Sequence, residues 1–354
     1  MDRALFLLSD YYLEKADEIC LRDQGKLLGD ICLNRVAGIA YLNLRKIKQN
    51  NVSSEFMRTL NRIYDSNCEE SKWFTKCVEY LADIFKDVTF EYAFLKGAYL
   101  ITKVYEKGLR TSSDIDVLVK ESDISNCEEL LLEHGFVQGS YIAGKGIVKA
   151  SRKEVLFSRM NYGETIPFWK SMEGRLFMLD INFSVDFKPD GSNGIVEELL
   201  RSRQLVNYRQ ETYYTLNKED FFIHLCCHLY KEATTMEWVK TNRDLSLYKF
   251  SDINIYLRSN ILKGYEDLKT RIVELGVCKE CYFSIVHACD IYPDLRKDFA
   301  LLEMIKDICP NNLEFMNEII DPLNKKKYRY DISFEEWFAA SHKLDKLTEV
   351  SDGN

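Results

Sequence analysis

The sequence predicts an α+β protein, with a small mixed-sheet core flanked along the chain by helical segments. Hydrophobic residues recur at helical spacing near the N-terminus and again after Asn217. Between these regions lie short apolar runs, some of them alternating with polar residues, which are typical of strands. Glycine and proline are scarce, with 16 and 5 among 354 residues, and this favours regular elements over loops.

The two ends of the chain are predicted to be helical. Leu5, Leu8 and Tyr12 share one helical face, and further periodic stretches begin at Ser53 and Ser71. The region after Asn217 shows the same periodicity almost to the C-terminus. The predicted parts are an N-terminal helical subdomain (1–87), a core (88–215) and a C-terminal helical subdomain (216–354).

Within the core, strands and helices are expected to alternate. A helix is expected over 98–105, and a second one begins with a capping box of Ser125 and Glu128 and ends at Gly135. The segment 188–194 is the clearest loop. The expected strands cover 89–95, 113–119, 154–157 and 176–183.

Composition limits the possible functions. The net charge is −8, from 48 basic and 56 acidic residues, so the overall charge does not favour binding to a phosphate backbone. The 11 cysteines are scattered, without the spacing of a disulfide scaffold. Neither a signal peptide nor an apolar stretch of about 20 residues is present. These features predict a cytoplasmic protein with free thiols and no membrane partner.

The strongest chemical signal is a pair of aspartates. Asp114 and Asp116 are two residues apart in a predicted strand, so both side chains point to the same face. Two carboxylates this close repel each other unless a cation neutralises them, and hard oxygen ligands suit Mg²⁺ or Mn²⁺. Asp180 lies in a second apolar strand. If the two strands are neighbours, three carboxylates converge, as a two-metal phosphoryl-transfer site requires. The alternative is a turn or a solvated strand face.

The segment before the pair supports a phosphate site. Lys96-Gly97 places a glycine where a strand turns into a helix, so backbone N–H groups could face a phosphate. Lys96 and Arg110 add cations that could hold a polyphosphate. Lys96 either serves as such a point charge or is simply exposed, and the sequence leaves both open.

These residues carry a family resemblance. Phe94-Leu95-Lys96-Gly97, with Arg110 and Ser113-Asp114-Ile115-Asp116, resembles the DNA polymerase beta-like nucleotidyltransferase superfamily. More narrowly, it resembles a poorly characterised bacterial branch that carries Leu-Lys-Gly where most members have Gly-Ser or Gly-Gly. Leu179-Asp180-Ile181-Asn182 is similar to that branch's Asp-x-His strand, with Asn182 where histidine is common. Weaker matches to flanking helices extend the resemblance over residues 30–260.

The resemblance implies a nucleotidyltransferase core and a metal-dependent reaction. Asp114 and Asp116 would bind the Mg²⁺ or Mn²⁺ ion that bridges the triphosphate, and Asp180 the ion that activates the acceptor hydroxyl. The donor would be an NTP, most simply ATP, and the products an NMP-modified acceptor and pyrophosphate. The residues expected to bind the nucleotide are Lys96, Gly97, Arg110 and Ser113.

The acceptor is not specified by these motifs. A hydroxyl on a small molecule or peptide is favoured, since the acidic net charge disfavours a polynucleotide. Two alternatives stay open. One is a toxin-like or regulatory member that modifies tRNA or a protein, for which the basic segment 325–330 is the visible start of a binding surface. The other is a catalytically silent nucleotide-binding module.

Other candidate residues have simpler interpretations. His224 and His228 share a helical face, but no glutamate follows His224, so a zinc-protease motif is absent and core or pocket-lining histidines are expected. Cys278, Cys281 and Cys289 form an apolar helical stripe rather than a zinc site.

Overall fold

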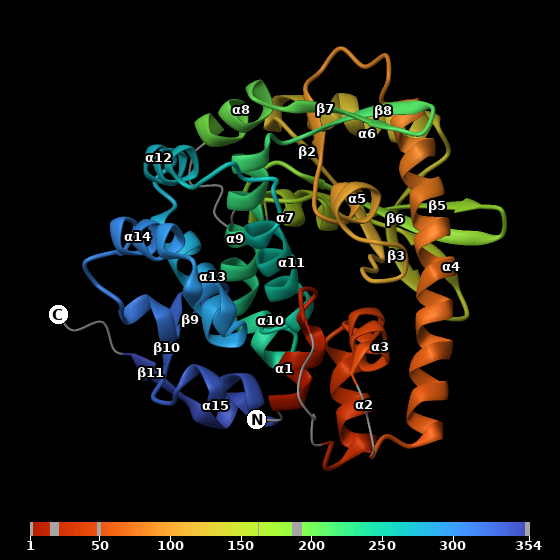
Figure 1. Ribbon diagram of the computed structural model, residues 1–354. Helices are drawn as coiled ribbons and strands as arrows, with labels where there is room; N and C mark the ends of the chain where they lie inside the picture. Colours follow the sequence, from red (N-terminus) through yellow and green to blue (C-terminus); the bar gives the residue numbers. More distant parts are fainter. Residues whose placement is uncertain (1–2, 15–20, 48–50, 162, 186–192, 351–354) are drawn as a thin grey trace. The chain divides into compact units, whose positions relative to one another are not determined.

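The computed structural model describes residues 3–14, 21–47, 51–161, 163–185 and 193–350. The chain divides into two compact units. The first, Asp65–Phe221, is called the sheet unit here. The second, the helical unit, combines Met1–Tyr64 with Phe222–Asn354. Two helices run across the boundaries between the units, α4 (Ser54–Ile84) and α9 (Lys218–Ala233) (Figure 1).

The sheet unit is built on one eight-stranded sheet with the order β4-β3-β5-β6-β2-β1-β8-β7. Two neighbouring pairs are parallel, β2 with β6 and β1 with β8, and the others are antiparallel. The mixed sheet confirms the predicted α+β class. The strands are β1 (Tyr92–Phe94), β2 (Asp114–Val119), β3 (Val137–Ile142), β4 (Gly146–Lys149), β5 (Phe168–Met172), β6 (Arg175–Asn182), β7 (Gln204–Tyr208) and β8 (Glu211–Thr215).

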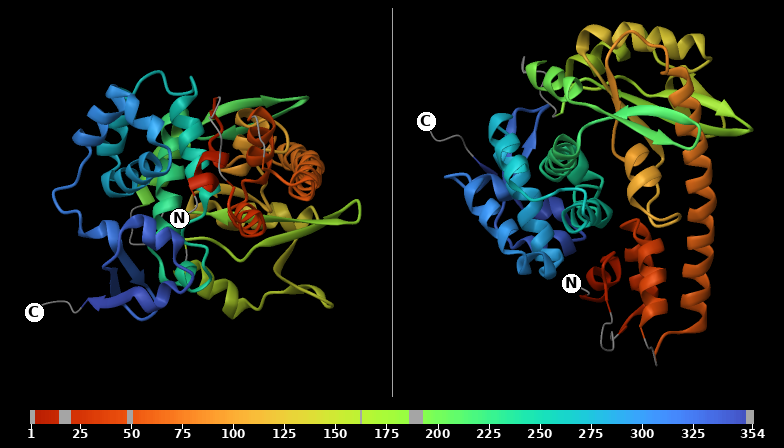
Figure 2. Two further views of the ribbon diagram at one scale, coloured as in Figure 1. Left: turned by 60° about the horizontal axis from the view of Figure 1, so that its bottom comes forward. Right: turned by 45° about the horizontal axis from the view of Figure 1, so that its top comes forward.

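Helices cover one face of this sheet and form a hydrophobic core with it. Ile115, Val117 and Val119 of β2 and the alternate residues of β6 share a buried core with apolar residues from the second half of α4. The second half of this helix, drawn in orange, lies against the sheet (Figure 2). The same core includes apolar residues of α6. The alternate side chains of β2 and β6 are left for the opposite face of the sheet. The helices of this unit are the end of α4, α5 (Gly97–Tyr99), a π-helix η1 (Leu100–Val104), a 3₁₀ turn η2 (Glu121–Asp123), α6 (Ile124–Glu133), α7 (Arg152–Asn161), α8 (Asn193–Arg201) and the start of α9.

The helical unit is centred on α11 (Leu247–Arg258), all but two of whose residues are buried. Asp10, beyond the end of α1, binds this helix through Asn254 Nδ2 at 2.8 Å and Arg258 at 3.2 Å. The remaining elements are α1 (Arg3–Ser9), α2 (Gln24–Leu33), α3 (Ala37–Lys46), α10 (Met236–Lys240), α12 (Glu266–Glu274), α13 (Cys278–Ile291), η3 (Pro293–Lys297), α14 (Phe299–Asp307), η4 (Glu314–Asn317), β9 (Glu318–Asp321), β10 (Lys326–Tyr330), α15 (Phe334–Ala339), η5 (Lys343–Lys346) and β11 (Leu347–Val350). No helix in the described ranges combines the length and apolarity needed to cross a membrane.

Two local predictions are wrong at segments that contain the same motif. The segment 154–157, expected as a strand, lies in α7, where Ser151 and Glu154 form reciprocal capping bonds at 3.3 and 2.7 Å. The capping box expected at Ser125 and Glu128 is absent, because Ser125 lies inside α6 and Glu128 binds Gln138 Nε2 at 3.1 Å. Both segments contain Ser-x-x-Glu, and the motif alone cannot distinguish a helix start from an interior. The end of α6 at Gly135, with φ of 77°, is confirmed.

Larger elements also differ from the expectation. The periodic stretches that begin at Ser53 and Ser71 form one continuous helix, α4, because no glycine or proline interrupts them. The C-terminal region ends in a three-stranded sheet, β11-β10-β9, rather than in helices. The predicted division 1–87, 88–215 and 216–354 also differs from the two compact units, since the second half of α4 belongs to the sheet unit. The expected loop 188–194 lies almost wholly outside the described residues.

Candidate active site

The register of β2 and β6 brings the predicted aspartates together. The strands are parallel neighbours in which Asp116 is paired with Asp180, and Asp114 with Met178. Because side chains alternate along a strand, Asp114, Asp116, Asp180 and Asn182 all lie on the face opposite the apolar core. The condition that the sequence left open, that the strand of Asp180 lies beside that of the pair, is met.

Asp116 accepts two side-chain hydrogen bonds on one carboxylate oxygen. Its Oδ1 accepts a hydrogen bond from Lys96 Nζ at 2.8 Å and another from Asn182 Nδ2 at 3.2 Å. The side chains of Lys96 and Asp116 are only 17% and 6% exposed. A buried charge of this kind requires a close partner, and here the partner is the Lys96 ammonium.

Asp180 differs from Asp116 in the hydrogen bonding of its carboxylate. Its Oδ1 is inaccessible to solvent and accepts no hydrogen bond from the part of the chain that the structure describes. Burial first, and then the negative charge of Asp116, raise the pKa of Asp180 well above its ordinary value. Asp114 and Glu164 add to the same effect. A buried carboxylate oxygen without a donor is a place where a cation or a substrate hydroxyl could bind.

Lys96 is held in an unusual backbone conformation. Its φ of 42° and ψ of −114° lie in a region that side chains other than glycine rarely adopt, at a cost of about 1–3 kcal/mol. The turn is closed by the Ala98 N–H, which donates to the Leu95 carbonyl at 3.1 Å, and Leu95 N–H in turn donates to the Asp116 carbonyl at 3.0 Å. Although burial by itself would lower the pKa of Lys96, the charges of Asp116 and Asp114 outweigh it and raise that pKa. Lys96 is therefore an ammonium ion at neutral pH.

Gly97 allows two segments of the site to approach closely. A Cβ atom at this position would lie 2.7 Å from both Cβ and Oγ of Ser112. The Ser112 hydroxyl donates to Asp114 Oδ1 at 3.1 Å. The glycine therefore lets the turn at Lys96 pack against the loop that orients Asp114, a steric role in addition to the phosphate contact predicted for it.

The other two predicted nucleotide-binding residues lie in that same loop. Arg110 is buried, and its guanidinium donates to the carbonyl of Thr111. Ser113 is exposed and, with Asp114, lines a cavity of about 220 Å³ between the loop, the start of β6 and α4. Their role in binding a nucleotide stays a prediction.

The sequence reasoning missed Glu164. Its backbone forms a bridge with that of Asn182, and the next residue, Thr165, donates its N–H to Ile181 at 2.9 Å. This pairing places Glu164 beside the far end of β6, where its charge acts on both Asp180 and Lys96. No motif or alternation surrounds this glutamate in the sequence, so only the strand pairing reveals it.

The donor set at this face suits a hard divalent cation. All the candidate ligands are carboxylate oxygens, the donors that Mg²⁺ and Mn²⁺ prefer, and Asp180 offers one that is unused. As the side chains lie, no three of the described His, Cys, Asp or Glu residues are arranged to hold a metal ion. The Lys96 ammonium is bonded to Asp116 in this arrangement. The residues therefore fit the cation chemically, although the side chains would have to shift to form a ligand set.

The remaining sequence candidates lie in the helical unit and have structural partners. His228 Nε2 lies 3.3 Å from Glu232 Oε1, and the rings of His224 and His228 are nearly parallel at 6.4 Å. Cys281 and Cys289 are buried thiols, as expected, and Cys278 is half-buried. In the basic segment, Lys326 pairs with a glutamate of β11, and Arg329 with glutamates of η4 and β9.

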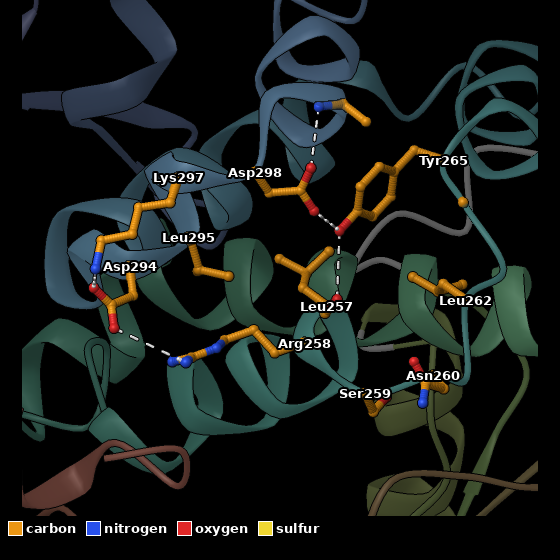
Figure 3. A pocket seen from close by; sticks show the side chains of 12 residues that line it. Leu257, Arg258, Ser259, Asn260, Leu262, Tyr265, Asp294, Leu295, Lys297 and Asp298 are labelled. Carbon is orange, nitrogen blue, oxygen red and sulfur yellow. Dashed lines mark hydrogen bonds and ion pairs between the residues drawn. The ribbon is translucent and has the colours of Figure 1, made fainter. Parts of the chain in front are cut away.

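The helical unit also contains a cavity of about 600 Å³ beside α11 (Figure 3). Its charged side chains bind one another: Asp294 pairs with Lys297 at 2.6 Å and faces Arg258 at 3.9 Å, while Tyr265 donates to Asp298 at 2.8 Å. Asp298 also caps α14. These polar groups hold η3 and α14 in place and do not point to a ligand.

Fold and site together define an α+β protein with a carboxylate cluster on the polar face of two parallel strands. The model of a family described as uncharacterised nucleotidyltransferase matches residues 22–293. The chain belongs to this family. No curated protein matches it. Among solved structures, it is similar to an antigenic nucleotidyltransferase-like protein from Paracoccidioides brasiliensis, with 16% identity and a TM-score of 0.37 over 66% of this chain and 93% of that one.

Proposed function

We propose that the protein transfers a nucleotidyl group, AMP from ATP, to a hydroxyl of a small molecule or peptide and releases pyrophosphate. The observation that carries this proposal is the pairing of Asp116 with Asp180 on parallel strands, with one oxygen of Asp180 left without a donor. Family membership supports the reaction class. The free cysteines among the described residues support a cytoplasmic location.

Each residue of the site has a role in this proposal. Asp114 and Asp116 would hold the Mg²⁺ or Mn²⁺ ion that accompanies the triphosphate, and Asp180 the ion on the acceptor side. When bound, these ions would neutralise charge that develops on the phosphate oxygens. Ser112 orients Asp114 through its hydroxyl, and Asn182 orients Asp116 through its amide. Glu164 extends the negative charge toward the acceptor side.

The acceptor class follows from charge. The chain carries a net charge of −8, and the basic segment around β10 is engaged by glutamates. A polynucleotide would therefore meet little attraction from this segment, and tRNA is the less favoured acceptor. We also propose that the turn of Leu95, Lys96 and Gly97 marks a bacterial branch of the family.

A thermal-shift panel tests the donor site. ATP, GTP, CTP and UTP are added with and without Mg²⁺ or Mn²⁺ to the wild type and to Asp116→Asn. We expect ATP to raise the melting temperature only when the divalent cation is present, and expect the variant to lose this shift. A shift that is independent of the cation and unchanged in Asp116→Asn would favour a catalytically silent nucleotide-binding module instead.

A further inference from the structure

The Lys96 ammonium is hydrogen-bonded to one of the two carboxylate oxygens of Asp116, a proposed cation ligand. Asp116 Oδ1 already accepts two hydrogen bonds, from Lys96 at 2.8 Å and Asn182 at 3.2 Å. A carboxylate oxygen has about two lone-pair sites, so this atom has no further capacity. A divalent cation that binds Asp116 through Oδ1 must therefore displace one of these donors.

In the free protein, Lys96 is a positive charge among the carboxylates of the site. Asp114, Asp116 and Glu164 all act on it electrostatically, and Lys96 in turn acts on Asp180. Without a cation among them, these carboxylates would repel one another across a largely buried face. Lys96 supplies that cation from within the chain.

The backbone at Lys96 indicates that the side chain is held there at a cost. Glycine would adopt a φ of 42° without strain, whereas lysine would not. Strained conformations of this kind persist where the surrounding structure enforces them, and they concentrate at functional sites. Here the close packing of Gly97 against Ser112 and the hydrogen bond from Leu95 to the Asp116 backbone hold the turn.

We propose that Lys96 is an exchangeable counter-cation, which neutralises Asp116 in the free protein and moves to the triphosphate when nucleotide and divalent cation arrive together. This inference rests on the proposed function. In this proposal, Lys96 has opposite effects on the binding of the two ligands. Lys96 opposes binding of the cation alone, because it occupies Asp116, and it supports binding of the nucleotide, because it then contacts a phosphate. Cation and nucleotide should consequently bind with positive cooperativity.

The test is a binding measurement without turnover. The affinity for Mn²⁺ alone is measured by electron paramagnetic resonance. The affinity for an α,β-methylene ATP analogue is then measured separately, at saturating Mn²⁺. The variants are Lys96→Gln, which removes the charge, and Lys96→Gly, which also relieves the backbone strain and so guards against misfolding. Lys120→Gln is the matched control, because Lys120 pairs with Glu91 at 2.7 Å in the same unit, away from the site.

We expect both Lys96 variants to bind Mn²⁺ alone about tenfold more tightly than the wild type and the nucleotide analogue about tenfold more weakly, as the loss of one charge interaction predicts. Lys120→Gln should change neither affinity. If the Lys96 variants bind Mn²⁺ no more tightly, while Asp116→Asn still weakens Mn²⁺ binding, the counter-cation role is overturned and the proposed site survives. If Asp116→Asn has no effect on Mn²⁺ binding in any background, the proposed function fails as well.

Discussion

Two aspartates with buried carboxylate oxygens differ in how completely these oxygens are hydrogen-bonded. Asp244, in the helical unit, accepts a hydrogen bond on each oxygen, from Lys343 Nζ at 2.7 Å and from Trp337 Nε1 at 2.9 Å. Asp180, in the sheet unit, has one oxygen without a donor and is paired across the strands with another carboxylate, Asp116.

The difference indicates that the carboxylate of Asp244 stabilises the fold, whereas that of Asp180 destabilises it. A buried carboxylate with both oxygens satisfied locks the elements that supply its partners. A carboxylate that is left incompletely hydrogen-bonded beside a like charge destabilises the folded state, and such residues are candidates for functional sites. The contrast between Asp244 and Asp180 is therefore open to experiment, because the two residues should respond differently to the same substitution.

The largest expected effect is on transfer activity. Asp180→Asn should reduce nucleotidyl transfer roughly a thousandfold, because the proposed function makes Asp180 a ligand of a cation that would contribute several kcal/mol to the reaction. The free energy of unfolding should not fall, since the substitution also removes repulsion from Asp116. Single-turnover transfer and urea unfolding measure the two quantities. A variant that loses stability but keeps its activity would show that Asp180 belongs with Asp244 as a structural residue.

The same change at Asp244 should act only on stability. Asp244→Asn leaves the buried ammonium of Lys343 without its counter-charge, and we expect a loss of about 3 kcal/mol in unfolding free energy. Nucleotide affinity of the protein that remains folded should be unchanged. Equal stabilities of Asp244→Asn and Asp180→Asn in urea would remove the distinction between the two sites.

A smaller effect is expected at Gly97. Gly97→Ala places a methyl group 2.7 Å from Ser112, so the loop must shift, at a cost of about 1–3 kcal/mol. Because Ser112 orients Asp114, Mn²⁺ affinity should fall as well. Gly29→Ala is the control: this glycine lies in α2 with open space around it, and alanine there should raise stability by about 0.5–1 kcal/mol. Isothermal calorimetry and thermal unfolding would report both changes.

The smallest effect concerns pH. Burial lowers the pKa of His287, which stacks on Phe334 in the helical unit. The unfolded chain therefore binds this proton more readily than the folded one, and the stability that neutral His287 contributes is lost as pH falls below its ordinary value of about 6.5. Between pH 7.5 and 5.5 the wild type should lose up to about 1 kcal/mol more than His287→Phe, which keeps the ring. Identical losses in urea titrations would show that this histidine does not contribute.

Much of the site could be predicted because its signals are local. The spacing of Asp114 and Asp116 places both on one face of any strand, and the apolar residues around Asp180 indicate a second buried strand. The mixed sheet and the flanking helices follow from periodicity in the same way. The site also requires that these two strands are neighbours, and in the structure β2 and β6 are adjacent and parallel.

The rest depends on contacts between distant segments. Glu164 joins the site only through pairing with β6, and the ion pair of Lys96 depends on a backbone conformation that propensity would assign to glycine. The C-terminal sheet was missed because its strands β9–β11 are short and charged. The helix start at Ser151 was missed because the short apolar run Val155-Leu156-Phe157 that follows is equally compatible with a strand.

Transfer of label from ATP distinguishes nucleotidyl transfer from phosphoryl transfer by this protein. The protein is incubated with Mg²⁺, a peptide and metabolite extract, and ATP labelled either at the α- or at the γ-phosphate, with Asp116→Asn in parallel. We expect that an acceptor in the extract gains the α-label, that the γ-label leaves in pyrophosphate, and that Asp116→Asn does not transfer the α-label. Transfer of the γ-label to the acceptor, or α-label transfer that survives in Asp116→Asn, would contradict the proposed function.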